Sequence, residues 1–382
     1  MQFSAKLRNP ITIDEAIDSL LDSQRARQDY TVPISTTRFG LNSQGNSLSV
    51  EVKGRPFEPT PHAMKQMANW CGVSHAVLNQ YTRDVYEQNG EIRYKRDAKD
   101  TELLLALFQN GMRDGRIDPD KEFRFRTYSD GTLRAMLSTQ YAPVDNVWYL
   151  EQLKKIFGEL GGDEPKFVHW QDNPDTMFGN LLLGDTVVDK GDSPYGGMFS
   201  IGNCEIGTRR LYQLLALWRQ VCTNGMMGWS QVGDKINKVH RGTIDLNYLS
   251  GRIRSNINEQ VPMIGASIDR FIALRDRRLE VTPDRMIAQI AQEHKLTFGQ
   301  NGQAAQTAIE WGTHEAGQAN LFGIVNAITR AAQKYDADEQ IRLEGIGGSF
   351  MNLSDSAWTR YNSRAKNMED KVYDKIYGRV AA

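Results

Sequence analysis

Residues 121–138, KEFRFRTYSDGTLRAMLS, contain the clearest strand pattern in the chain. Phe123 and Phe125 alternate with Arg124 and Arg126, which is the period of two expected of a strand with one apolar face. Asp130-Gly131 favours a type I′ turn, and TLRAML returns as the second strand. The stretch therefore predicts a β-hairpin.

The flanking sequence mixes further strand patterns with helical ones. Residues 34–52 predict another hairpin, and short strands are expected between 166 and 207. Helical periodicity is seen after the Thr12/Glu15 capping box, at 148–162, at 246–294, at 319–335 and from 355 onward. We therefore expect an α+β fold of antiparallel strands and hairpins packed with helices, with a helical C-terminal part. The expected division is 1–100, a helix, a hairpin and a helical pair; 101–280, the α+β core; and 281–382, mainly helical.

Residues 208–222, TRRLYQLLALWRQVC, predict a further helix. Thr208 is a candidate N-cap, and Asn224-Gly225 favours a helix end. A strand is expected to follow in MMGWSQV. The apolar stripe of this helix recurs at steps of three and four, at Leu211, Leu214, Leu215, Trp218 and Cys222.

Composition narrows the class of protein. The chain has 382 residues, 40% of them hydrophobic and 24% charged, which is typical of a soluble protein. No apolar run is long enough to span a membrane, and the first ten residues lack the apolar stretch of a secretory signal. We therefore expect a cytoplasmic protein with no membrane partner. The cysteine and histidine spacings match no metal motif, so we expect no metal and no cofactor.

Charge is unevenly distributed along the chain. The net charge is −1, yet residues 204–278 contain twelve Lys/Arg and six Asp/Glu. A local basic surface on a neutral protein favours a nucleic-acid partner, although solvated helices give the same surplus.

Cys222 is followed by His240, which raises the alternative of a thiol enzyme. A nucleophilic cysteine needs a base within reach. Because Cys222 shares the apolar stripe of the predicted helix, the sequence favours a buried thiol that acts as a small hydrophobe. No catalytic constellation is evident, so we expect a protein that is not an enzyme.

Residues 58–81 resemble a helix-turn-helix, with Gly72 in the turn and Leu78 as an apolar anchor. A duplex-reading regulator is therefore an alternative. A recognition helix needs donors for bases and phosphates, and Arg83 is the only fixed cation between Ser74 and Asn89. The shortage of cations favours two helices that simply pack at a glycine turn.

Cations and aromatic residues alternate along 209–254, a pattern that suits single-stranded nucleic acid, since cations follow phosphates while rings stack on bases. The alternative is that Trp218 and Trp229 belong to the core and the arginines form surface ion pairs. The candidate nucleic-acid-binding residues are Arg209, Arg210, Arg219, Trp229, Lys238, Arg241, Tyr248, Arg252 and Arg254.

Four segments resemble a family of phage- and plasmid-related proteins catalogued as a domain of unknown function. They are TPHAMKQMANWCGVSHAVL (60–78), LSTQYAPVDN (137–146), LYQLLALWRQVCTNGM (211–226) with KVHRG (238–242), and ANLFGIVNAITRAAQ (319–333). The R-x-V-C-x-N-G pattern is present as Arg219, Val221, Cys222, Asn224 and Gly225, with His240 following. The resemblance implies a mobile-element protein in a bacterial host and a distant relationship to single-strand annealing recombinases, which assemble into rings or filaments. We therefore expect a homo-oligomeric protein that binds and anneals single-stranded DNA in recombination or replication.

Overall fold

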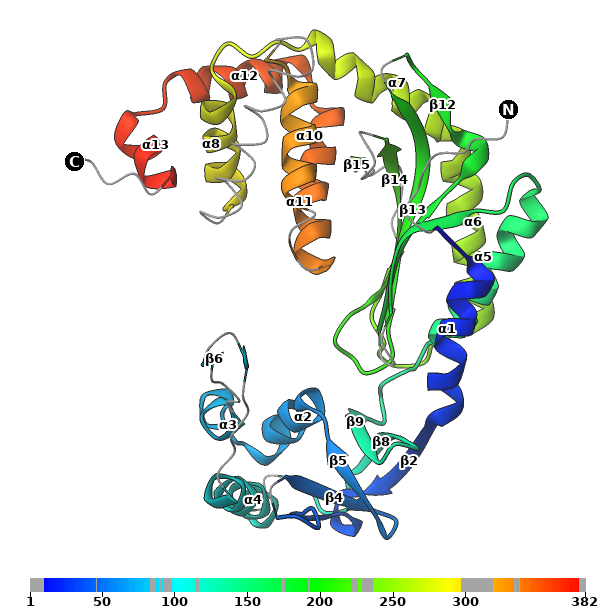
Figure 1. Ribbon diagram of the computed structural model, residues 1–382, viewed down its shortest axis with the longest axis vertical. Coiled ribbons are helices and arrows are strands. Elements are labelled where there is room, and N and C mark those ends of the chain that lie inside the picture. The colour runs from blue at the N-terminus through cyan, green and yellow to red at the C-terminus, as the bar shows by residue number, and fades with distance from the viewer. Residues whose placement is uncertain are drawn as a thin grey trace.

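The computed structural model describes residues 10–45, 47–82, 87–88, 91–92, 98–114, 117–172, 176–191, 193–220, 226–228, 236–296, 319–332, 335 and 337–377. They form two lobes, each built around a sheet of its own (Figure 1). The lower lobe comprises the described residues between 27 and 138, and the upper lobe comprises Ile11–Thr12, helix α1 (Ile13–Ala26) and the described residues between 146 and 377. Antiparallel strands, packed helices and a helical C-terminal part confirm the expected α+β class.

The lower lobe contains a six-stranded sheet of order β2-β8-β9-β5-β4-β3. All neighbours are antiparallel except β5 and β9, which are parallel. Helices pack on this sheet, and the sheet and helices together enclose a hydrophobic core that is separate from the core of the upper lobe. The strands are β2 (Arg27–Pro33), β3 (Arg38–Leu41), β4 (Leu48–Val52), β5 (Arg55–Pro59), β8 (Glu122–Tyr128) and β9 (Thr132–Ser138); the helices are α2 (Pro61–Cys71), α3 (His75–Thr82) and α4 (Ala98–Arg113); β6 (Glu87–Gln88) and β7 (Glu91–Ile92) form a separate pair.

Both predicted hairpins are present, as β3–β4 and β8–β9. The turn of the second one differs from the prediction. Three residues, 129–131, connect β8 to β9, and only Gly131 among them has a positive φ, of 82°. A type I′ turn needs positive φ at two residues, so this connection is a three-residue loop with glycine in the left-handed position.

Helix α4 extends beyond the apolar run at 103–108 in both directions, and Gly111 lies inside it. A Cβ atom at Gly111 would stand 2.2 Å from the carbonyl oxygen of Cys71 at the end of α2. The glycine therefore permits close approach of two helices, a role that depends on tertiary packing.

The upper lobe contains an eight-stranded antiparallel sheet in which β1, β10, β11, β13, β14 and β15 follow one another; β12 also pairs with β13, and β16 with β14. The strands are β1 (Ile11–Thr12), β10 (Lys166–Asp172), β11 (Thr176–Leu182), β12 (Val188–Asp189), β13 (Pro194–Cys204), β14 (Leu211–Arg219), β15 (Met226–Gly228) and β16 (Ile236–Lys238).

Strand β14 occupies the place of the helix predicted at 208–222, so that prediction was wrong. The strand lies inside the sheet, between β13 and the pair β15 and β16. Leu215 and Leu217 join the core on one face, and Ala216 and Trp218 are buried on the other. A strand buried on both faces has an almost continuous apolar run, whose periodicity does not distinguish it from a buried helix.

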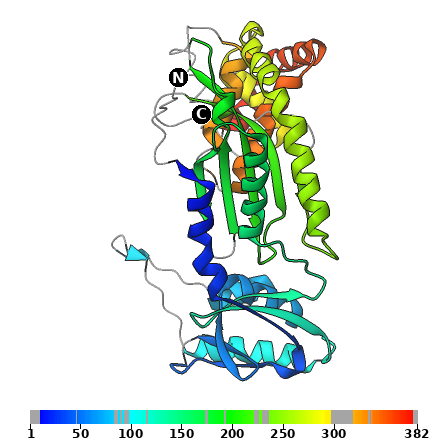
Figure 2. The same ribbon diagram turned by 90° about the vertical axis from the view of Figure 1, so that its right-hand side faces the viewer.

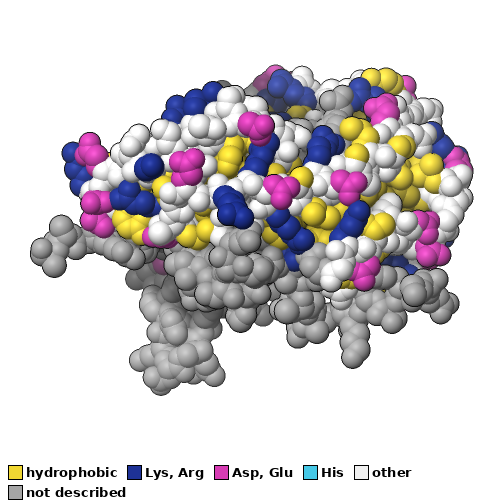
Figure 3. All heavy atoms as spheres, turned by 90° about the horizontal axis from the view of Figure 1, so that it is seen from above, with side chains coloured by type: hydrophobic (Ala, Val, Ile, Leu, Met, Phe, Trp, Pro, Cys, Tyr) yellow, Lys and Arg dark blue, Asp and Glu magenta, His cyan; other side chains and the backbone are white. Residues whose placement is uncertain are grey.

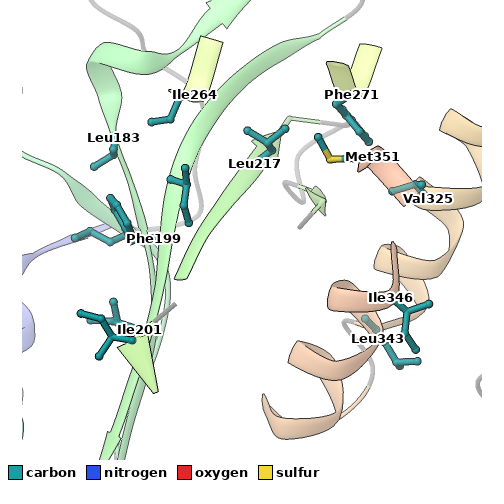
Figure 4. Close-up of a cluster of buried hydrophobic side chains, with 14 of the residues drawn as sticks. Leu183, Phe199, Ile201, Leu217, Ile264, Phe271, Val325, Leu343, Ile346 and Met351 are labelled. Atoms are coloured by element: carbon teal, nitrogen blue, oxygen red, sulfur yellow. The ribbon is translucent and has the colours of Figure 1, made fainter. Parts of the chain in front are cut away.

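Helices α1, α5 (Asn146–Leu160) and α6 (Leu246–Gln260) lie along one face of the upper sheet (Figures 1 and 2). The capping box predicted at Thr12 and Glu15 is formed at the start of α1. Helix α7 (Ile264–Ala273) packs against the upper ends of β13 and β14, where Ile264 lies near Leu217 and Phe271 faces the C-terminal helices (Figure 4).

The C-terminal part is helical, as expected: α8 (Pro283–His294), α10 (Leu321–Ala332), α11 (Ala337–Ser349), α12 (Asp355–Lys366) and α13 (Asp370–Tyr377). Its apolar side chains belong to the same core as those of α1 and the upper sheet. The expected boundary at residue 100 falls inside the lower lobe, because β8 and β9 share a sheet with β2 and β5. In the described part of the chain, no helix is both long and apolar enough to cross a membrane.

Candidate functional site

A cleft of about 500 Å³ lies where the two lobes meet, and we call it the waist cleft. Helix α2, the end of β9 and its following loop, the turn after β13, and the loop after β16 all contribute to it. None of its described lining residues is acidic. They are Gln66, Asn69, Trp70, Met136, Leu137, Ser138, Gln140, Tyr141, Gly207, Val239, His240 and Arg241.

Two loops that are far apart in the sequence pair to form one wall of the cleft. The Gly242 amide donates to the carbonyl oxygen of Gln140 at 2.9 Å, and the Ala142 amide donates to that of His240 at 3.4 Å. The rings of Tyr141 and His240 stack at a centroid distance of 5.3 Å. The wall is therefore held by backbone hydrogen bonds and ring stacking together.

Helix α2 forms the opposite wall and is fixed to both lobes. The Gln66 side chain accepts a hydrogen bond from the Met136 amide at 2.8 Å and donates to the carbonyl oxygen of Ile206 at 3.1 Å. Trp70 is half-buried, and the ammonium of Lys121 lies 4.0 Å from the centroid of its indole ring. This wall thus presents an aromatic surface beside a cation.

A partly buried ion cluster joins the lobes near the cleft. Arg126, fully buried, donates to both carboxylate oxygens of Asp29 at 2.8 and 3.0 Å and to the carbonyl oxygen of Glu205 at 2.6 Å. Arg27 donates to Asp145 and Glu205, at 2.8 Å each. Burial raises the pKa of Glu205, while the charges of Arg27 and Arg126 oppose that rise. These two arginines are therefore occupied in joining the lobes.

Four of the predicted cations gather near the waist cleft. Arg241 lines the cleft and is exposed, and the exposed Lys238 stands opposite Leu211 in the β14–β16 pair. Arg209 and Arg210 lie in the connection between β13 and β14, just before Leu211. They precede a strand rather than the helix predicted at 208–222. We call Arg209, Arg210, Lys238 and Arg241 the rim cations.

Helix α6 begins just after the loop that follows β16, and it contains three of the predicted nucleic-acid-binding residues. Tyr248 is 67% exposed, and the exposed Arg252 follows it by one helical turn on the same side. Arg254 instead forms an ion pair with Glu159 of α5. The surface-ion-pair alternative therefore applies to Arg254, whereas Tyr248 and Arg252 face solvent.

The structure removes Arg219 from the candidate contact residues. Its side chain is buried, its Nε donates to the Ser193 hydroxyl at 2.8 Å, and its guanidinium lies 4.8 Å from the Phe322 ring centroid. Arg219 ends β14, and Arg210 precedes its start, which separates them by about 30 Å at the usual rise per residue. The core alternative also holds for Trp218, which is fully buried.

Trp229 and Cys222 lie outside the described residues. His240 is described, and its Nδ1 lies 3.1 Å from the Ala142 carbonyl oxygen. Cys71 and Cys204 are buried, and burial raises the pKa of the Cys71 thiol to about 12. Among the residues described, no three His, Cys, Asp or Glu side chains gather where they could hold a metal ion.

Sequence reasoning missed Trp70, Gln140 and Tyr141 as site residues. They lie in two of the segments on which the family resemblance rests, 60–78 and 137–146, and the structure brings these segments together with 238–242. Those segments were the available signal, but a linear pattern could not show that they converge.

Charges elsewhere are arranged differently. Seen from above, the upper face mixes basic and acidic side chains over its visible surface (Figure 3). The C-terminal helices contribute to ion pairs such as Arg277–Asp355 and Arg364–Glu293. A mixed surface of this kind is typical of a solvated face and does not favour a polyanion.

No family model, no curated protein and no solved structure matches this chain.

Proposed function

We propose that the protein binds single-stranded DNA across the waist cleft. The observation that supports this most strongly is the composition of the cleft: aromatic rings and amides line it, no described lining residue is acidic, and the rim cations stand beside it. Phosphates would lie along Lys238, Arg241 and the Arg209–Arg210 pair, while bases contact the aromatic and amide surface.

Tyr248 and Arg252 extend this surface onto α6. An exposed ring one turn from an exposed guanidinium offers a second stacking and phosphate contact for the same strand. We keep both residues in the proposed interface and leave out Arg219 and Arg254.

A single strand suits the cleft better than a duplex does. Bases of a single strand are available for stacking, whereas a duplex offers its grooves and needs a helix with donors. Helix α3, HAVLNQYT, contains neither lysine nor arginine, and α2 is held against β9 through Gln66. The helix pair therefore gives little support to the duplex-reading alternative.

The proposal includes the biological setting inferred from the sequence. We propose that the protein acts without catalysis in recombination or replication of a phage or plasmid, in the cytoplasm of a bacterial host. We also propose assembly into a homo-oligomeric ring or filament that promotes strand annealing.

The test is fluorescence anisotropy with a labelled thymine homopolymer, with a duplex of equal length for comparison. We expect preference for the single strand and affinity that falls steeply with salt, because each phosphate contact releases counterion. A lack of measurable binding at low salt, or preference for the duplex, would contradict the proposal.

Annealing and assembly need separate measurements. The rate at which complementary labelled strands pair should rise with added protein, and light scattering should report particles larger than one chain. If the protein binds the strand but leaves the pairing rate unchanged, binding stands and annealing does not.

A further inference from the structure

His240 has an unusual position in the wall of the waist cleft. Its ring lines the cleft, yet only 5% of the residue is exposed. Nδ1 lies 3.1 Å from the Ala142 carbonyl oxygen, and Nε2 is buried with no hydrogen-bond partner among the residues that the structure describes. Nδ1 therefore contributes to the fold, whereas Nε2 has no hydrogen-bond partner among the described residues.

The bond to Ala142 fixes the protonation of the ring. A carbonyl oxygen can only accept, so Nδ1 must carry the proton. Burial and the nearby Arg126 lower the pKa of His240, although the bond to Ala142 opposes this, so the ring is neutral near pH 7. In a neutral imidazole the second nitrogen then has a lone pair, which makes Nε2 an acceptor.

A buried acceptor without a partner is costly, and such groups in proteins usually meet a protein group, an ordered water or a ligand. The surroundings suit a flat ligand with polar edges. Tyr141 stacks on the imidazole, Met136 and Leu137 are apolar, and Asn69 and Gln140 provide amides. Arg241 is the one cation among the described lining residues, so the cleft can pair with one phosphate near its opening rather than with several phosphates inside it.

We propose that a nucleobase of the bound strand leaves its stack, enters the waist cleft and donates an N–H hydrogen bond to Nε2 of His240. This rests on the single-stranded DNA binding proposed above and specifies that the cleft recognises the base edge rather than the backbone. Every natural base has at least one N–H donor on its pairing edge, so this contact tolerates any sequence. Nε2 has almost no exposed surface, so side chains must move, and the neighbouring Val239 and Arg241 are both exposed.

The test compares a thymine homopolymer with the same strand made of N3-methylthymine. The two strands have the same phosphates and the same ring, but the methylated base has no N–H donor on its edge. We expect the native protein to bind the thymine strand about five- to ten-fold more tightly, the usual range for one hydrogen bond to a buried group. An abasic strand of equal length measures the contribution of the backbone alone.

His240→Phe keeps a ring that can stack on Tyr141 and removes the acceptor. We expect this variant to bind both strands equally, at about the affinity of the native protein for the methylated strand. His169→Phe is the matched control, since His169 is a partly buried histidine on β10 that does not line the cleft; this variant should keep the preference for thymine.

The outcomes separate the two proposals. If no strand binds, the proposed function fails. If the native protein binds thymine and N3-methylthymine strands equally, DNA binding stands and base recognition fails, whatever happens to the folding of His240→Phe. If both the native protein and His240→Phe discriminate to the same extent, the methyl group is excluded by its size and the role of His240 is refuted.

Discussion

The two ends of β14 place arginine in opposite environments. At the upper end, Arg219 is buried, donates to Ser193 and lies over Phe322. At the lower end, Arg210 precedes the strand with an exposed side chain, near Lys238 of β16. A guanidinium in the core contributes to folding, whereas an exposed one is available to a partner. Position in the sheet, rather than residue type, therefore separates a buried arginine from one that is available to a partner.

Of the substitutions considered, the one at the upper end of β14 should have the largest effect, and that effect is on stability. Arg219→Ala removes a buried hydrogen bond and the contact with Phe322 and leaves a cavity, so we expect a loss of about 3 kcal/mol in the free energy of unfolding. Chemical denaturation measures it, and Arg210→Ala is the matched control, which should unfold as the native protein does. Equal stability of the two variants would remove the contrast between the ends.

Substitutions at the lower end of β14 should lower the affinity for single-stranded DNA. Combining Arg210→Gln, Lys238→Gln and Arg241→Gln should weaken single-strand binding on the order of a hundred-fold and reduce the salt slope by about 2, with unchanged stability.

The control for that variant combines Arg277→Gln, Arg285→Gln and Arg364→Gln, which removes three cations that pair with acidic residues of the C-terminal helices. This control should bind DNA like the native protein. If both triple variants lose affinity equally, only net charge matters, and the rim cations form no specific surface.

Helix α6 offers a smaller test within one element. Tyr248→Ala should weaken binding roughly five- to ten-fold through lost stacking. Arg252→Gln should weaken it by a few-fold, whereas Arg254→Gln should leave it unchanged, because Arg254 is paired with Glu159. The same anisotropy assay measures all three, and a larger effect at Arg254 than at Arg252 would mean that the strand follows a different side of α6.

The middle of the sheet should give the smallest effect. Ser200, which pairs with Leu214 of β14, is fully buried, and its hydroxyl has no partner among the described residues. Ser200→Ala removes a desolvated hydroxyl with little loss of volume, so we expect a free energy of unfolding within about 1 kcal/mol of that of the native protein, in the stabilising direction. Destabilisation beyond that in a denaturant titration would indicate that the hydroxyl bonds to ordered water.

Sequence patterns predicted the elements whose signals are local. The capping box at Thr12 and Glu15, the hairpin at 121–138 and the amphipathic helix at 148–162 each depend on residues a few positions apart, and all three are present. The prediction for β14 was wrong because burial on both faces removes the alternation of apolar and polar residues that identifies a strand. The role of Gly111 was not predicted, because it depends on Cys71 in another helix.

The candidate site was predicted in part. The sequence identified Lys238, Arg241 and Tyr248, since cations and aromatic residues can be recognised by type. It considered His240 as the partner of a thiol and as part of the KVHRG segment, whereas the structure shows it bound to Ala142 and stacked on Tyr141. Trp70 and Gln140 were missed because nothing local indicates that 60–78 and 137–146 meet.

By itself the sequence determined the α+β class, several local elements and the surplus of cations in 204–278, because propensity, periodicity and charge are properties of neighbouring residues. Only the tertiary structure decided which cations are buried, that three distant segments form the waist cleft, and that His240 has a spare acceptor in its wall. Burial and convergence depend on contacts between residues far apart in the chain, and a linear pattern does not specify those contacts.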